Sequence, residues 1–203
     1  DGEVLVENLN VSIRRGERIL IGGDPAVTIS LFKAVAGLWP WGNGEILLPD
    51  DVSIMFLPQR PFLPEGTLQN ALSYPRPSDH FSTPAIHHAL ECAGVTWLTS
   101  RLQETDEWDR SLPLRAQQRL GIARMFLHNP AWVFIEEATD AFDPKGEDAM
   151  MQMIRRELPN ATLMAISFHN DLDHYYTRKL ILNRQTEPRI VTCATERCQL
   201  RKS

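Results

Sequence analysis

The sequence predicts an α/β fold with a mostly parallel sheet, flanking helices, an antiparallel edge sheet and an α-helical insertion. Short apolar runs alternate along the chain with segments whose apolar residues recur at helical spacing. The clearest run, Trp132 to Ile135, is continuously apolar, which predicts a parallel strand buried on both faces. Residues 4 to 13 instead alternate apolar and polar side chains, so an outer, half-buried strand of the antiparallel part is expected there.

Length and composition favour one globular domain. The chain has 203 residues, 43% of them hydrophobic, and a formal net charge of -5. This mild acidity argues against a nucleic-acid partner. The three cysteines cannot form a full disulfide framework, which favours a reducing, cytosolic environment. No apolar run approaches the roughly 20 residues that span a bilayer, so the isolated chain is expected to be soluble, with any membrane association through a partner.

The first β-to-α connection lies where nucleotide-binding folds hold phosphate. A strand is expected at Arg18 to Ile21 and an apolar helix at Leu31 to Leu38, with GGDPAVTIS between them. A phosphate-binding loop follows the pattern G-x-x-x-x-G-K-[ST], whose glycines let backbone N-H groups converge and whose Lys reaches the β and γ phosphates. Here the loop is one residue short, contains Pro25 and lacks the Lys. The segment is therefore either a purely structural turn or an altered phosphate loop.

The middle of the chain predicts two short strands followed by helices. Strand-like segments are expected at residues 45 to 48 and 53 to 57, and residues 67 to 103 show helical apolar spacing broken by prolines. His87 and His88 are adjacent rather than four residues apart, so they are interpreted as surface residues and not as shared metal ligands.

A helix, a strand and a carboxylate pair follow each other at residues 116 to 143. The helix is expected to stop at Asn129-Pro130, and the buried strand ends in Glu136 and Glu137. Open α/β sheets bind ligands beyond the carboxyl ends of their strands. The pair is therefore a candidate site, and a solvated pair at a strand exit is the alternative.

The last third predicts a helix from Pro144 to about Leu158, a buried strand at residues 161 to 167, and strands near residues 178 to 182 and 189 to 192. The tail after Cys193 is polar and expected to be loose.

Three segments carry a resemblance to a known family. AGLWPWGNGEI, FLPQRPFLPEGTLQNALSYP and WDRSLPLRAQQRLGIAR, with the strand and Glu pair that follow, resemble ABC-transporter ATPases. The branch they resemble holds bacterial permease-ATPase fusions of the peptide-antibiotic and vitamin B12 uptake type and peroxisomal fatty-acyl transporters. The resemblance implies a P-loop NTPase-like ABC ATPase domain over residues 1–192, with a helical subdomain at about 67–128 and a polar tail at 193–203. Members usually carry a further strand upstream, so the chain is expected to be part of a longer polypeptide.

The resemblance also implies roles for individual residues, with ATP and Mg²⁺ as cofactors. Glu137 takes the position of the catalytic Glu that polarises the attacking water, and His169, with a one-residue slip, that of the switch histidine. Glu136, Gln59 and Ser30 take the Mg²⁺-associated positions, although the family has Asp where Glu136 stands. Nucleotide-contacting positions fall on Gly23, Thr28, Ser30, Gln59 and Arg115.

Other family positions are altered. In the signature segment, Pro113 stands where the family has Ser, and Leu114 and Arg115 stand where it has glycines. Ungapped matching puts Phe168 at the switch position. Because side chains there block a close backbone approach to phosphate, ATP binding is expected to be weak or absent.

Two functional hypotheses remain. In the first, the chain is the ATP-binding domain of an ABC transporter, coupling ATP binding or hydrolysis to transmembrane transport. It would form a head-to-tail dimer with a second ABC domain and attach to the cytoplasmic face of a membrane through a transmembrane permease domain. In the second, it is a catalytically inactive ABC-like module that serves dimerisation or regulation. The altered motifs leave ATPase activity an open question.

Overall fold

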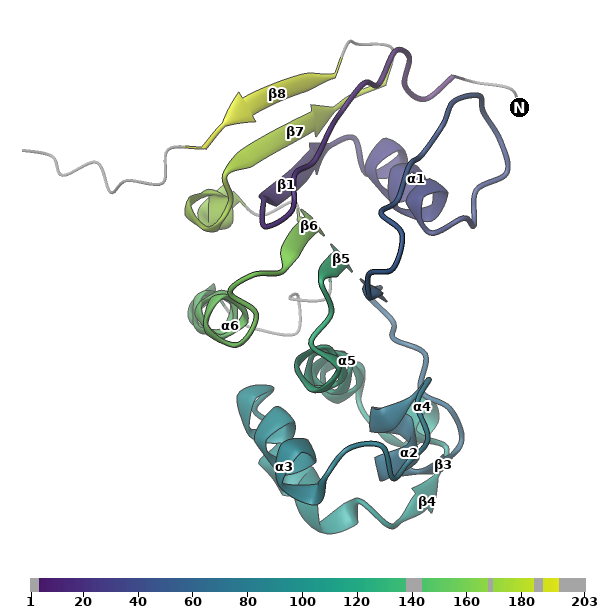
Figure 1. The fold of residues 1–203 in the computed structure, drawn as a ribbon, viewed down its shortest axis with the longest axis vertical. Coiled ribbons are helices and arrows are strands. Elements are labelled where there is room, and N and C mark those ends of the chain that lie inside the picture. The colour runs from purple at the N-terminus through teal and green to yellow at the C-terminus, as the bar shows by residue number, and fades with distance from the viewer. Residues whose placement is uncertain (1–3, 138–143, 168–169, 185–187, 194–203) are drawn as a thin grey trace, which may run out of the picture. The chain divides into compact units, whose positions relative to one another are not determined.

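The computed structural model describes residues 4–137, 144–167, 170–184 and 188–193. The chain divides into two compact units, the first made of Asp1–Asp51 with Ala161–Ser203 and the second of Val52–Asn160. Each unit is described by itself below (Figure 1).

The first unit is built on strands in the order β6-β1-β7-β8. β1 pairs in parallel with β6 and β7, and β8 runs antiparallel to β7 at the edge, as Figure 1 shows for β1, β7 and β8. The central strand β1 is almost wholly buried, with Ile19, Leu20 and Ile21 at 3% exposure or less. The elements are β1 (Arg18–Gly23), β6 (Thr162–Ile166), the 3-10 helix η2 (Asn170–Tyr175), β7 (Arg178–Leu182) and β8 (Arg189–Thr192).

Helix α1 (Pro25–Val35) begins earlier than the sequence predicts, at Pro25 rather than Leu31. The Asp24 side chain caps it by accepting a hydrogen bond from the Ala26 N-H, and Pro25 occupies the first helical turn, where its missing N-H costs no intrahelical bond. The segment interpreted as a turn or loop is therefore mostly helix.

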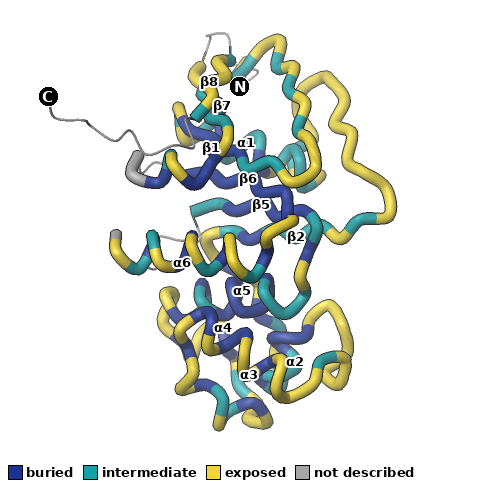
Figure 2. The backbone as a smooth tube through the Cα atoms, turned by 60° about the vertical axis from the view of Figure 1, so that its left-hand side comes forward, coloured by how far each residue is buried: buried dark blue, intermediate teal, exposed yellow. Residues whose placement is uncertain are grey.

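The second unit contains the buried strand that the apolar run predicts. β5 (Trp132–Glu136) pairs in parallel with β2 (Ile54–Leu57), and the rings of Phe56 and Phe134 stack with centroids 4.8 Å apart. All four residues from Trp132 to Ile135 are buried, and Figure 2 shows β5 in the buried colour. The parallel pairing and the burial of this strand are confirmed.

Helix α5 (Leu114–His128) precedes β5 and packs against both α2 and α3. It ends where the sequence predicts, because Asn129 adopts the left-handed conformation (φ 45°, ψ 58°) and Pro130 follows. After β5, helix α6 (Pro144–Glu157) matches the predicted helix to within one residue.

The rest of the second unit consists of short elements, consistent with the prolines in this region. Trp108 is fully buried and donates from its indole nitrogen to the Gly66 carbonyl at 2.9 Å, which ties α4 to β3. The elements are β3 (Gly66–Thr67), α2 (Leu68–Ser73), α3 (Thr83–Cys92), the 3-10 helix η1 (Thr96–Arg101), β4 (Thr105–Asp106) and α4 (Trp108–Ser111).

Two predicted strands are wrong. Residues 4 to 13 form no strand, and Asn8 has a φ of 54°, which breaks an extended backbone. Residues 45 to 48 also form no strand, and Leu47 is 81% exposed. In both segments the apolar pattern is real but no sheet edge pairs with it. Among the described residues, no helix combines the length and the hydropathy that a bilayer crossing requires.

Candidate functional site

The carboxylate pair lies at the carboxyl end of β5. Glu136 is the last residue of the strand and Glu137 follows it, and both are half-buried. Glu137 has a φ of 46°, an uncommon conformation for a residue with a side chain. Such outliers cost free energy and collect at functional sites, which supports Glu137 as a candidate site residue.

Gln59 reaches the same edge from the neighbouring strand. It follows β2, which is parallel to β5, so the two carboxyl ends meet. The Gln59 side-chain amide donates to Glu137 Oε2 at 3.1 Å. The structure thus brings together a residue that the family resemblance associates with Mg²⁺, Gln59, and one that it associates with the attacking water, Glu137. Their oxygen atoms are the donor type that Mg²⁺ prefers.

Gln118 holds this arrangement from α5 and was missed by the sequence analysis. Its side chain is almost fully buried, at 3% exposure, and its amide donates to the Gln59 backbone carbonyl at 3.1 Å. A polar residue on a helix face that the apolar spacing places inward was the available signal. By fixing the Gln59 backbone, Gln118 limits where the Gln59 amide can point.

The first β-to-α connection is short. One residue, Asp24, separates β1 from α1. Gly23 has a φ of 116°, and a Cβ there would lie 2.0 Å from the Leu182 carbonyl oxygen. The Asp24 N-H also donates to that oxygen at 2.7 Å. Gly23 therefore allows the end of β1 to pass close to the backbone of β7.

Thr28 and Ser30 lie within α1, and both hydroxyls donate to backbone carbonyls of that helix. Thr28 Oγ1 donates to the Pro25 oxygen at 3.1 Å, and Ser30 Oγ donates to the Ala26 oxygen at 2.7 Å. Thr28 is completely buried, whereas Ser30 is half-buried.

A carboxylate of the protein occupies the N-terminus of α1. Asp24 Oδ1 accepts from the Ala26 N-H at 2.8 Å, and Asp24 Oδ2 lies 3.0 Å from Arg184 Nε. Helix N-termini attract anions because their N-H groups and the helix dipole both favour negative charge. In this structure Asp24 supplies that negative charge.

Arg115 lies in the first turn of α5 and is exposed. Pro113 is the N-cap of this helix, and it makes no side-chain hydrogen bond to the helix N-terminus. His169 and the neighbouring Phe168 lie outside the described residues.

Sequence comparison finds similar proteins over most of the chain. No family model matches it. It is 35% identical to an uncharacterized ABC transporter ATP-binding protein of Haemophilus influenzae, over 89% of this chain and 31% of that protein. It is 33% identical to ABC transporter D family member 1 of Arabidopsis thaliana, over 76% of this chain and 12% of that protein. The chain thus spans about a third or less of the length of these relatives.

Comparison of folds gives the same class. The chain aligns with the structure of a bacterial Atm1-family ABC exporter with ATP bound at a TM-score of 0.76 and 20% identity, over 88% of this chain and 34% of that one. An inward-facing putative metal-chelate type ABC transporter aligns at a TM-score of 0.69 and 18% identity, over 91% and 76%.

The chain therefore has the mostly parallel α/β fold of the ABC-type P-loop NTPases. The sequence matches then confirm the resemblance to ABC-transporter ATP-binding proteins, the D family included. In both sequence and fold, the chain is thus similar to the ATP-binding domains of ABC transporters.

Proposed function

We propose that this chain is the ATP-binding domain of an ABC transporter and that this copy is impaired in ATP binding and hydrolysis. The observation that supports the impairment is the β1-to-α1 connection, where Asp24 alone separates the strand from the helix. A phosphate-binding loop needs several consecutive backbone N-H groups that converge on phosphate, together with a Lys.

The changes at the β1-to-α1 connection should lower the affinity for ATP. A missing charge-assisted contact leaves roughly 1.5 to 3 kcal/mol unmade, so absence of the Lys alone weakens ATP binding about 10- to 100-fold. Pro25 removes one further N-H donor. The Asp24 carboxylate at the N-terminus of α1 adds repulsion toward a phosphate in the same place.

Within the second unit, the contact between Gln59 and Glu137 supports a retained ABC-type layout. In this proposal Glu137 and His169 take the catalytic positions, and Ser30, Gln59 and Glu136 take the Mg²⁺ positions. The partners are a transmembrane permease domain and a second ABC domain in a head-to-tail dimer. The domain would then lie on the cytoplasmic face of a membrane, held there through the permease.

A catalytically inactive ABC-like module for dimerisation or regulation is the second candidate. The Asp24 cap of α1 favours it, because the chain then needs no nucleotide to satisfy that helix N-terminus. Pro113 at the N-cap of α5 favours it as well, since it provides no hydroxyl to meet a phosphate.

Calorimetric titration of Mg-ATP into the purified chain tests the impairment. We expect no binding tighter than roughly 1 mM. The variant Glu137→Gln, which leaves the β1-to-α1 connection unchanged, is the matched control and should behave like the wild type. A micromolar dissociation constant would refute the impairment.

Sedimentation analysis separates the two candidates. A transporter domain should pair with a competent ABC domain when that partner holds ATP, and should separate without nucleotide. A dimerisation module should self-associate to the same extent with and without ATP.

A further inference from the structure

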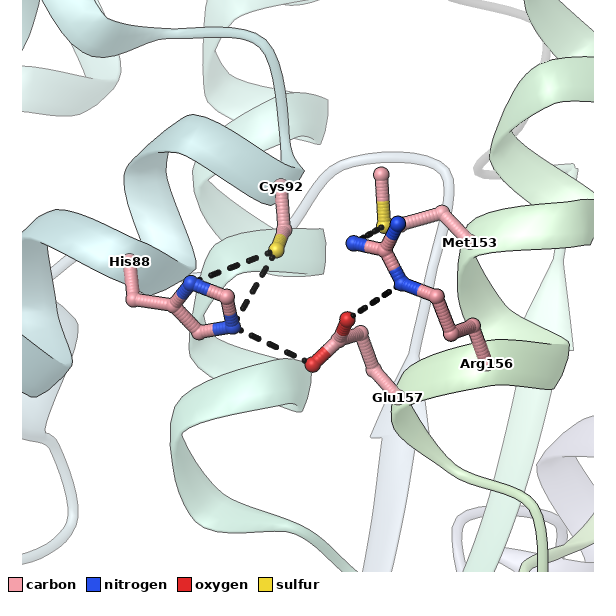
Figure 3. A network of polar contacts seen from close by, with 5 residues as sticks. All are labelled: His88, Cys92, Met153, Arg156 and Glu157. Atoms are coloured by element: carbon pink, nitrogen blue, oxygen red, sulfur yellow. Dashed lines mark hydrogen bonds and ion pairs between the residues drawn. The ribbon is translucent and has the colours of Figure 1, made fainter.

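Three side chains that commonly ligate metals meet in the second unit, where the end of α3 faces the end of α6 (Figure 3). His88 and Cys92 are one helical turn apart on α3, and Glu157 is the last residue of α6. One ligand atom from each residue can be chosen so that all three lie within 4.8 Å of one another. None of the three is among the residues assigned to ATP.

The separations suit a tetrahedral ion. His88 Nε2 lies 3.5 Å from Cys92 Sγ and 3.2 Å from Glu157 Oε2. Zinc bonds of about 2.3 Å to sulfur and about 2.0–2.2 Å to nitrogen or oxygen, at tetrahedral angles, put neighbouring ligand atoms roughly 3.4–3.6 Å apart. The His88–Cys92 separation therefore already has the required length, and the His88–Glu157 separation is slightly shorter than required. The third edge, between Cys92 and Glu157, can close by side-chain rotation.

The donor set indicates which metal suits the cluster. A thiolate, an imidazole and a carboxylate together favour a borderline cation such as Zn²⁺ over Mg²⁺ or Ca²⁺, which prefer oxygen ligands alone. Three protein ligands leave the fourth position of a tetrahedral ion for water. The exposure of the His88 side chain, 58%, leaves room for that water.

A neighbouring arginine orients the carboxylate. Arg156 Nε donates to Glu157 Oε1 at 2.8 Å, which leaves Oε2 facing His88. Ligating carboxylates in metal sites are commonly hydrogen-bonded in this way. The Arg156 guanidinium also contacts Met153 Sδ at 3.0 Å (Figure 3).

Protonation affects the ligands differently. The pKa of the Glu157 carboxyl is lowered by its hydrogen bonds from Arg156 and His88, so this ligand is ionised at neutral pH. Burial, with a smaller contribution from Glu157, raises the pKa of the Cys92 thiol. A bound cation would have to displace the thiol proton into solvent, which makes binding stronger as the pH rises.

We propose that His88, Cys92 and Glu157 form a zinc-binding site that joins α3 to α6. When Zn²⁺ binds, the Cys92 S-H bond breaks, a Zn-S bond forms and the proton leaves to solvent. The ion cross-links two helices from distant parts of the sequence, so it stabilises the folded chain by mass action.

Zinc titration of the metal-free chain, followed by calorimetry against a competing chelator, tests the proposal. We expect one ion per chain. His88→Asn and Glu157→Gln should weaken binding at least about 100-fold, since even outer-shell changes cost roughly 10- to 100-fold. With Co²⁺ as probe, the near-ultraviolet thiolate-to-cobalt absorption should appear and be lost in Cys92→Ser.

Matched controls carry the same residue types outside the cluster. His87→Asn, Glu91→Gln and Cys193→Ser should keep full zinc affinity and the cobalt absorption. Circular dichroism checks that each variant folds, and the His88 and Glu157 variants decide the matter if Cys92→Ser does not. Absence of zinc binding, or equal loss in ligand and control variants, would overturn the proposal.

Discussion

The absence of a side chain at Gly121 lets α5 lie close to β2 and to the segment that carries Gln59. A Cβ built at Gly121 would lie 2.7 Å from Leu57 Cδ1 and 3.2 Å from Pro61 Cβ. Both neighbours are held, since Leu57 is a buried strand residue and the proline ring is rigid. Only a residue without a side chain fits this contact as it stands.

We therefore expect Gly121→Ala to destabilise the fold by about 1–3 kcal/mol through overpacking, measured by chemical denaturation. Gly22→Ala is the control, because its added Cβ meets Lys179 Cε at an ordinary 3.6 Å. Equal loss in both variants would mean that strand or helix propensity, and not the α5 contact, dominates.

His128 makes the stability of the chain depend on pH. Burial, together with the charges of Arg124 and Arg76, lowers its pKa against the opposing effect of hydrogen bonds with the Leu72 and Ser73 backbone. Its ring packs against Phe81 with centroids 4.8 Å apart. Because the folded pKa lies below the unfolded value of about 6.5, the unfolded chain binds more protons as the pH falls through that range. The contribution of His128 is thus present above about pH 6.5 and is lost on acidification toward the folded pKa.

Denaturant titrations at pH values on both sides of about 6.5 should show the loss of stability on the acid side for the wild type. His128→Phe, which keeps a ring against Phe81 and removes the titration, should reduce that loss. His87→Asn, an exposed histidine on α3, should leave it unchanged. An unaltered pH slope in His128→Phe would contradict the assignment.

Elements whose pattern and end signals agree were predicted from the sequence. The apolar run of β5 and the Asn129-Pro130 stop of α5 depend on local chemistry, and both lie where the sequence predicts them. Residues 4 to 13 have the alternating pattern of a strand but form none. A strand also needs a partner strand, and the sequence of the segment alone does not determine whether one is available. For α1, the Asp24-Pro25 start signal was present in the sequence but outweighed by the expectation of a loop.

Some of the candidate site residues could be predicted from the sequence, and others only from the packed structure. The resemblance assigns both Gln59 and Glu137 to the ATP site, and the parallel pairing of β2 and β5 brings the two side chains into contact. His88 and Cys92 are four residues apart on α3, but this spacing alone does not distinguish a pair of ligands from two unrelated side chains on one helix face. The third member of the cluster, Glu157, is distant in sequence, so only the packed helices bring it into reach.

The Asp24 cap at the N-terminus of α1 should contribute measurably to the stability of the chain. Asp24→Ala removes the cap and the Arg184 ion pair, and should cost about 0.5–2 kcal/mol, nearly all of it from the cap. Asp24→Ser keeps a capping oxygen and should recover most of the loss, as thermal and denaturant unfolding would show. If Arg184→Ala alone costs as much as Asp24→Ala, the ion pair matters more than the cap.

At the scale of the whole molecule, we predict that repair of one motif will not give hydrolysis. Phosphoryl transfer depends on several parts that position the phosphate and stabilise its charge together, and the effects of losing such parts are strongly non-additive. A full-length Gly-Lys-Ser loop in place of Val27 to Ile29 should restore some ATP binding but little turnover. Pro113 at the start of α5 and Phe168 at the switch position would still lack groups that close on the γ phosphate.

Turnover should appear only when the loop, the signature segment and Phe168→His are rebuilt together, and it should vanish again on Glu137→Gln. Gln59→Ala in the rebuilt chain should also lower it, because the Gln59 amide donates to Glu137 Oε2 at 3.1 Å and so helps to position that carboxylate. Steady-state phosphate release, measured alongside ATP affinity for each variant, distinguishes lost binding from lost chemistry. Substantial turnover from the loop repair alone would show that the signature and switch positions were never limiting.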